Sequence, residues 1–126
     1  MPTKAKKYAW EQLAPDHPIA LLERRRILGE RMMVAQIHLD QGCTVDRHAH
    51  ENEQISVVLV GRLRFLVGEG ASEREVIVAG GEVLHLPSNV PHAAEALEDT
   101  LALDLVSPPG AMGVDRQGRG GDGRSG

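Results

Sequence analysis

Two stretches of the chain carry histidines at spacings that suit a metal centre. Residues 48–54 read His-Ala-His-Glu-Asn-Glu-Gln, and His92 lies in a second stretch far along the sequence. In an extended strand, residues two apart point to the same face, so His48 and His50 would share one side and Gln54 could return to it. Imidazole nitrogens and amide oxygens are ligands for divalent metals. The spacing therefore predicts one metal ion bound by His48, His50, Gln54 and His92.

The predicted ligand set leaves the identity of the metal open. Zn, Ni, Mn, Fe and Co all accept such ligands, and open coordination positions would remain for water or substrate. Because Gln54 is neutral, the ion would keep its full double charge, act as a strong Lewis acid and favour an anionic substrate. This ligand set favours Lewis-acid chemistry over redox chemistry.

Short strands are the elements that would position these side chains. Apolar runs separated by glycine or proline are typical of β-structure, and no stretch predicts an amphipathic helix of useful length. The candidate strands cover residues 20–28, 31–39, 45–50, 53–60, 62–67, 74–78, 82–86, 92–97 and 100–106. Closely spaced strands of this kind predict an all-β domain, with a jelly-roll barrel as the natural way to hide the sheet edges.

The residues around both histidine stretches resemble the two sequence motifs of the cupin family. The first motif is matched by Gly42, His48, His50 and Gly61, with Gln54 in the place of a glutamate, and the second by Gly81, Pro87 and His92. The resemblance covers about residues 30–107 and implies the cupin double-stranded β-helix, a jelly-roll barrel. Asn89 replaces a motif glycine, a mild change because asparagine tolerates positive φ.

A closer resemblance is to the small cupins of pectin and alginate breakdown, which linearise 4,5-unsaturated uronates. It is carried by residues 50–54, 86–92 and 104–109. It implies a metal-dependent enzyme of isomerase or lyase type, in which Asp104 is catalytic and moves a proton between substrate oxygen and carbon. Those cupins have phenylalanine and arginine where this chain has Val106 and Gly110.

The orientation of Asp104 is predicted differently by pattern and by resemblance. Leu101, Leu103 and Leu105 share one strand face, while Ala102 and Asp104 share the other. Hydrophobicity alone favours the leucines inside, whereas the resemblance implies that Asp104 faces the cavity.

Two other functions stay open at this stage. Similar small cupins are Fe, Mn or Cu oxygenases that cleave small organic molecules, and others bind small molecules without catalysis. Oxygen consumption would distinguish the first of these, and binding without turnover the second.

Composition sets bounds on partners and location. The net charge of −4 and the 2% aromatic content argue against nucleic acid as a partner. One cysteine, no secretory signal and no apolar membrane span predict a cytoplasmic protein. The resemblance to small cupins, which commonly pair through sheet faces or exchanged edge strands, implies a small-molecule substrate and a second copy in a homodimer, with residues 20–28 contributing to the contact.

Three regions of the chain are expected. Residues 1–18 would form an N-terminal arm, residues 19–107 the barrel, and residues 108–126 a glycine-rich, flexible tail with little apolar surface to bury. In the arginine run of residues 24–26 we expect solvated side chains, with Arg26 the candidate for a pocket.

Overall fold

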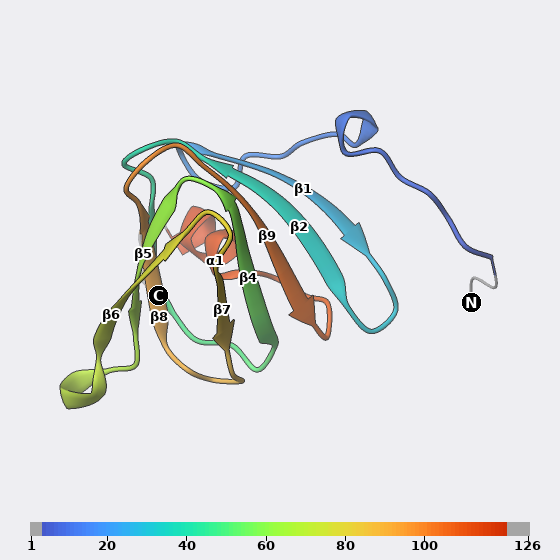
Figure 1. Cartoon of the computed structure of the whole chain (residues 1–126). Helices are drawn as coiled ribbons and strands as arrows, with labels where there is room; N and C mark the ends of the chain where they lie inside the picture. Colours follow the sequence, from blue (N-terminus) through green and yellow to red (C-terminus); the bar gives the residue numbers. More distant parts are fainter. Residues whose placement is uncertain (1–3, 121–126) are drawn as a thin grey trace.

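The structure, a computed structural model, describes residues 4–120, and its regular secondary structure is mostly strand (Figure 1). The strands are β1 (Leu22–Leu28), β2 (Met33–Leu39), β3 (Thr44–His48), β4 (Glu53–Val60), β5 (Arg62–Val67), β6 (Arg74–Ala79), β7 (Val83–Leu86), β8 (His92–Ala96) and β9 (Thr100–Ser107). The helices are two 3-10 turns, η1 (Trp10–Gln12) and η2 (Gly70–Ser72), and the α-helix α1 (Gly113–Gly120). The all-β prediction is confirmed, and every predicted strand is present with its ends shifted by two residues or fewer.

The strands form two antiparallel sheets that face each other (Figure 1). One sheet has five strands in the order β1-β2-β9-β4-β7, and the other has four in the order β3-β8-β5-β6. Neighbours in the sheets are often distant in sequence, as β9 is between β2 and β4. Residues from opposite ends of the chain are therefore brought to one interior.

The register of the five-stranded sheet turns two predicted functional residues toward that interior. Asp104 on β9 pairs with Ala35 on one side and Ser56 on the other, and Gln54 on β4 pairs with Val106. Four of these five residues are buried and Asp104 is partly buried. Asp104 therefore faces inward, as the resemblance implied and the leucine pattern did not.

The core between the sheets is aliphatic, with Phe65 as its one aromatic side chain among the buried residues that the structure describes. Phe65 and Leu63 extend from β5 and belong to one core cluster with Ala35 and Val58 of the larger sheet. Strand β4 is buried on one face only, because its outer face is partly exposed at Ile55 and open at Leu59.

Two turns need unusual backbone conformations. Gly61, between β4 and β5, has φ +98°, and a Cβ there would collide with the carbonyl oxygen of Asp99 and with Thr100. Asn89 has φ +67°, which confirms that asparagine takes the conformation of the glycine it replaces.

The expectation that the tail has little apolar surface to bury is wrong for residues 111–117, which we call the C-terminal segment. Met112 and Val114 are 6% and 5% exposed, and helix α1 begins between them. The glycine content suggested weak order, but two apolar side chains with a place in the core are enough to anchor the segment. The prediction also missed α1, while residues 121–126 of the tail lie outside the described residues. Within residues 4–120, no helix is long and apolar enough to cross a bilayer.

Candidate metal centre

Three imidazole rings meet inside the barrel. The potential ligand nitrogens of His48, His50 and His92 all lie within 4.8 Å of one another. Their ring centroids are 4.2 Å apart for His48 and His92, 5.2 Å for His50 and His92, and 5.4 Å for His48 and His50. The three histidines predicted from two distant stretches therefore form one cluster that could hold a single metal ion.

Each ring is oriented by a hydrogen bond to the backbone. The Nδ1 atoms of His48, His50 and His92 lie 2.8, 2.9 and 2.9 Å from the carbonyl oxygens of Asp46, Asn52 and Val90. Because a carbonyl oxygen only accepts, each Nδ1 carries the proton and each Nε2 keeps its lone pair. Bonds of this kind commonly fix the tautomer of metal-binding histidines.

The buried nitrogen of His92 shows that the cluster suits a cation. Among the described residues, His92 Nε2 is the one buried side-chain polar atom without a hydrogen-bond partner. Leaving such an atom unpaired costs free energy, and a metal ion would satisfy it. The donor set and its orientation both fit a divalent transition metal.

Two of the histidines, His48 and His92, have environments that favour the neutral state that metal binding requires. Burial lowers the pKa of His92 to about 4, against an opposing hydrogen bond to Val90 and with help from the neighbouring His48 and His50. Burial is also the main cause that lowers the pKa of His48. Neutral imidazoles offer a ligand lone pair at physiological pH.

The strands reach this arrangement by a route that simple alternation does not describe. The β3–β8 register shifts between Val45 and His48, where β3 contains a bulge. The bulge adds a residue and turns His48 to the inner face, paired with His92. His50 lies beyond the end of β3, so the strand alternation expected for His48 and His50 is not what brings their rings together.

Gln54 and Asp104 are linked by Ser56, and all three residues lie on the five-stranded sheet. Gln54 Nε2 donates to Ser56 Oγ at 3.0 Å, and Ser56 Oγ donates to Asp104 Oδ1 at 2.7 Å. Because the amide nitrogen is used in this way, the oxygen of Gln54 remains available as a donor to a cation. The sequence analysis assigned no role to Ser56, which links the two side chains.

Asp104 has an environment that favours its neutral form. Burial raises the pKa of Asp104 to about 6, although the hydrogen bond from Ser56 and the nearby His50 act in the opposite direction. A carboxyl group with such a pKa can both hold and release a proton near neutral pH.

One small cavity joins these groups. It has a volume of about 60 Å³ and is lined by His48, His92, Gln54, Ser56 and Asp104 together with apolar side chains. Ala94 lines it beside His92, which confirms that small residues on β8 leave space there. The histidine face and the carboxylate face therefore border the same space.

The C-terminal segment forms one wall of this cavity. Met112, Gly113 and Val114 line it, and Gly113 lies directly on the His48 ring, where any Cβ would collide. The sequence analysis assigned no role to these residues, because the glycine-rich sequence around them suggested a flexible tail. The sequence signal that could have found them is the short apolar pattern of Met112 and Val114.

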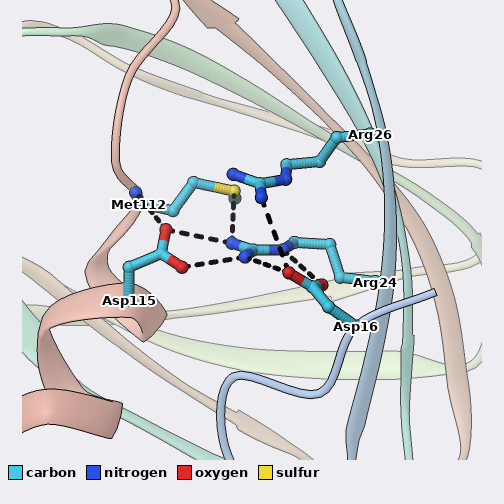
Figure 2. Close-up of polar contacts among 5 residues, drawn as sticks. All are labelled: Asp16, Arg24, Arg26, Met112 and Asp115. Carbon is cyan, nitrogen blue, oxygen red and sulfur yellow. Dashed lines mark hydrogen bonds and ion pairs between the residues drawn. The ribbon is translucent and has the colours of Figure 1, made fainter. Parts of the chain in front are cut away.

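The arginine run is placed differently from the prediction. Arg24, not Arg26, is the buried member, at 2% exposure, while the Arg26 side chain is 32% exposed. Figure 2 shows the guanidinium of Arg24 between the carboxylates of Asp16 and Asp115. Two acidic partners offset the cost of burying the charge, which a local reading of residues 24–26 could not anticipate.

The remaining histidines and the cysteine lie outside the cluster. His17 and His38 are exposed, and exposed His85 contacts Glu53 at 2.6 Å. Cys43 is buried, and burial raises the pKa of its thiol, so the structure gives it no reactive character.

Comparisons with known proteins agree with this geometry. The sequence profile described as cupin domain (Cupin_2) matches residues 35–107. The structure is similar to that of KdgF from Halomonas sp., with a TM-score of 0.75 and 23% identity over 85% of this chain and 96% of that one. It is also similar to an RmlC-like cupin from Shewanella frigidimarina, with a TM-score of 0.75 and 22% identity over 84% and 93% of the two chains.

A curated relative matches a shorter stretch of the sequence. The 3-hydroxyanthranilate 3,4-dioxygenase of Rattus norvegicus is 33% identical over 58 residues, which are 46% of this chain and 20% of the relative. The chain thus spans about a fifth of the length of that relative.

Proposed function

The chain belongs to the cupin domain family, and from that membership we propose that it is a metal-dependent enzyme that opens the ring of a small acidic sugar. The substrate class is a 4,5-unsaturated uronate, on the basis of the sequence resemblance around residues 50–54, 86–92 and 104–109. One observation carries the proposal: two members of the oriented three-histidine cluster, His48 and His92, border the same cavity as a carboxyl group of raised pKa.

The proposed metal ligands are His48, His50, Gln54 and His92. A divalent transition metal bound there would act as a Lewis acid on a carbonyl or hydroxyl oxygen of the substrate. The Nδ1 bonds of the three histidines fix their rings, and Ser56 fixes the Gln54 amide. Because all four ligand side chains are neutral, a bound divalent ion would keep its double positive charge, which favours an anionic substrate.

Asp104 is the proposed catalytic residue. In the ring opening, the bond between the anomeric carbon and the ring oxygen breaks, the anomeric hydroxyl loses a proton and C4 gains one. Asp104 would accept the proton from oxygen and return it to carbon, so the reaction is an isomerisation without a co-reactant. The hydrogen bond from Ser56 Oγ holds the carboxyl group in place for both transfers.

The test follows the ultraviolet absorbance of an unsaturated uronate, which disappears as the double bond is converted into a ketone. Purified protein loaded with Zn, Ni, Mn, Fe or Co is added in turn, and bound metal is measured for each sample. We expect turnover with at least one metal, loss of both metal and turnover in His48→Ala, and loss of turnover with retained metal in Asp104→Asn. Bound metal without turnover of any uronate would refute this function.

A second candidate is a dioxygenase. It is supported by the partial sequence match to 3-hydroxyanthranilate 3,4-dioxygenase together with the three-histidine cluster. Oxygen uptake by Fe-, Mn- or Cu-loaded protein with aromatic or diketone substrates would favour this alternative. Binding of a uronate without turnover would instead favour a non-catalytic cupin.

A further inference from the structure

Arg24 is held by two carboxylates in a nearly solvent-free position (Figure 2). From Asp16, Oδ1 accepts from Nε at 3.0 Å and Oδ2 from Nη2 at 2.8 Å. From Asp115, Oδ2 accepts from Nη1 at 3.0 Å and Oδ1 from Nη2 at 2.8 Å. Both are two-pronged pairs, the geometry in which a guanidinium binds a carboxylate best.

The guanidinium lies directly behind one wall of the cavity. Leu22, on the same face of β1, and Ile37, the cross-strand partner of Arg24, both line the cavity. Arg24 Nη1 contacts Met112 Sδ at 3.5 Å, and Met112 lines the cavity on its other side. The side chain of Met112 therefore stands between Arg24 and the candidate metal centre.

The cavity is too small for a uronate while that wall is in place. Its volume of about 60 Å³ corresponds to only about four water molecules, at roughly 15 Å³ of accessible volume each. Pockets for organic ligands are usually several times larger, about 300 Å³ or more. A uronate can reach the histidines only if part of the lining moves.

The C-terminal segment is held to the barrel by two buried apolar side chains, Met112 and Val114, and by few polar contacts. Among the described residues, its polar contacts to the strands and loops are exposed ones apart from those of Arg24 with Asp115 and with Met112 Sδ: Gln117 bonds to Thr44 and Asp46, and Arg116 to Ala49. The strands that form the rest of the lining are held by backbone ladders along most of their length, interrupted by register shifts in β3 and β4. Displacing the segment therefore disrupts less structure than moving any strand.

We propose that Asp115 occupies the position of a substrate carboxylate on Arg24, and that an acidic substrate enters by displacing the C-terminal segment and pairing with this guanidinium. Arg24 is then a specificity-determining residue for the acid group. The proposal rests on the function proposed above for the choice of a uronate, but the docking geometry of Asp115 does not depend on a bound metal.

Charge balance supports an acid in this position. Arg24 and Arg26 are matched by Asp16 and Asp115, so the closed cluster is neutral. When Asp115 leaves, one positive charge is uncompensated and Arg24 keeps its two-pronged pair with Asp16. Once Asp115 has left, the cluster offers a carboxylate an open position and one uncompensated positive charge. A neutral sugar would instead leave the buried guanidinium with unpaired donors.

The test compares two sugars that differ in the acid group, D-galacturonate and D-galactose. Binding is measured by calorimetry for the parent protein, Asp115→Asn and Asp16→Asn, each with zinc added and each without metal. Asp16→Asn is the matched control, because it removes a carboxylate from the same guanidinium and leaves Asp115 in place. Bound zinc is measured separately, so that failure of the metal site is distinguished from failure of this proposal.

We expect Asp115→Asn to bind galacturonate about tenfold more tightly than the parent protein, since a competing internal carboxylate no longer reduces the open population. Galactose binding should not change, and Asp16→Asn should not reproduce the gain. Equal or weaker galacturonate binding by Asp115→Asn, or an equal gain for galactose, would overturn the proposal.

Hydrogen exchange gives a readout that does not depend on a variant. Galacturonate should speed exchange of the backbone amides in residues 112–117 of the parent protein, because the acid releases them from the barrel. Slower or unchanged exchange in these residues at saturating galacturonate would show that Asp115 only anchors the chain.

Discussion

Asp104 shows how a single side chain can be unfavourable for stability and useful for chemistry. Its carboxyl group lies on the inner face of β9, among buried apolar neighbours, with one hydrogen bond from Ser56. The pKa of about 6 reflects the cost of charging it there. Buried groups with perturbed pKa values are common in active sites for this reason.

We predict that, without metal, the Asp104→Asn variant becomes more stable relative to the parent protein as pH rises. Between pH 3.8 and about 6 the folded carboxyl keeps a proton that the unfolded chain releases. The contribution of Asp104 to the free energy of unfolding is therefore greatest below pH 3.8 and is lost as pH rises through about 6. Since asparagine has no such loss, the variant should gain about 2–3 kcal/mol on the parent between pH 4 and pH 7.5.

Urea unfolding at both pH values, with metal removed, measures this difference. The same substitution at the exposed Asp40 is the control for removing a negative charge. A stability difference between Asp104→Asn and the parent that does not change with pH would contradict the prediction.

The sequence predicted which residues form the candidate metal centre more completely than it predicted how their side chains are oriented. Spacing and resemblance together identified the three histidines that the structure brings together. The reasons were partly wrong, because a bulge and a strand end orient His48 and His50. Arg24 was not predictable, since its partners Asp16 and Asp115 are 8 and 91 residues away and nothing local indicates burial.

At the scale of elements, the contact between α1 and the histidine cluster matters most. Gly113 starts the helix and lies against the His48 ring without room for a methyl group. The helix can close the cavity only because this position has no side chain. The backbone of α1 and the orientation of His48 are therefore coupled.

Gly113→Ala should destabilise the protein by about 1–3 kcal/mol, because the new methyl group overpacks the contact with His48. The direction of the stability change is informative, since alanine is otherwise favoured over glycine in helices by about 1 kcal/mol. Metal should also dissociate faster to a chelator, because His48 must turn to make room.

Gly110→Ala is the matched control, as its added methyl group would meet only Asn52 Nδ2, at 3.4 Å. Unfolding curves and chelator competition for both variants check the prediction. A stabilised Gly113→Ala protein would mean that the helix is not packed on His48 in solution.

The strands were predictable and the helix was not, for a physical reason. Each strand carries its own pattern of apolar residues between turn residues, and Gly61 and Asn89 mark turns by their conformational freedom. Helix α1 has no such pattern of its own. It is stabilised by packing of apolar side chains between strands that are distant in sequence. The local sequence pattern cannot show those contacts.

For the whole molecule, the outer face of the five-stranded sheet is the remaining apolar surface of note. The register aligns Ile27, Val34, Leu105 and Ile55 in one row across β1, β2, β9 and β4. Val57 and Val83 continue the apolar surface in the next row, and Val83 is 58% exposed. The jelly-roll prediction is confirmed. These apolar residues point outward from the barrel, so they do not take part in its interior packing.

We predict that this face joins two copies of the chain into a homodimer, as the sequence led us to expect. Light scattering should give twice the chain mass for the parent protein. Leu103→Lys, in the middle of the face, should give the single-chain mass because a charge would be buried without a partner. Ser88→Lys, in an exposed loop, is the control, and a monomeric parent protein would contradict the prediction.

The two faces of the cavity come from different sheets, with His48 and His92 on one and Gln54 on the other. An ion bound to all three would therefore act as a cross-link between halves of the barrel that are otherwise joined by apolar packing and loops. Because the unfolded chain cannot offer this arrangement, every tenfold excess of free ion over its dissociation constant would add about 1.4 kcal/mol to folding. How long a molecule survives in the cell would then depend on the local supply of the ion as well as on the sequence.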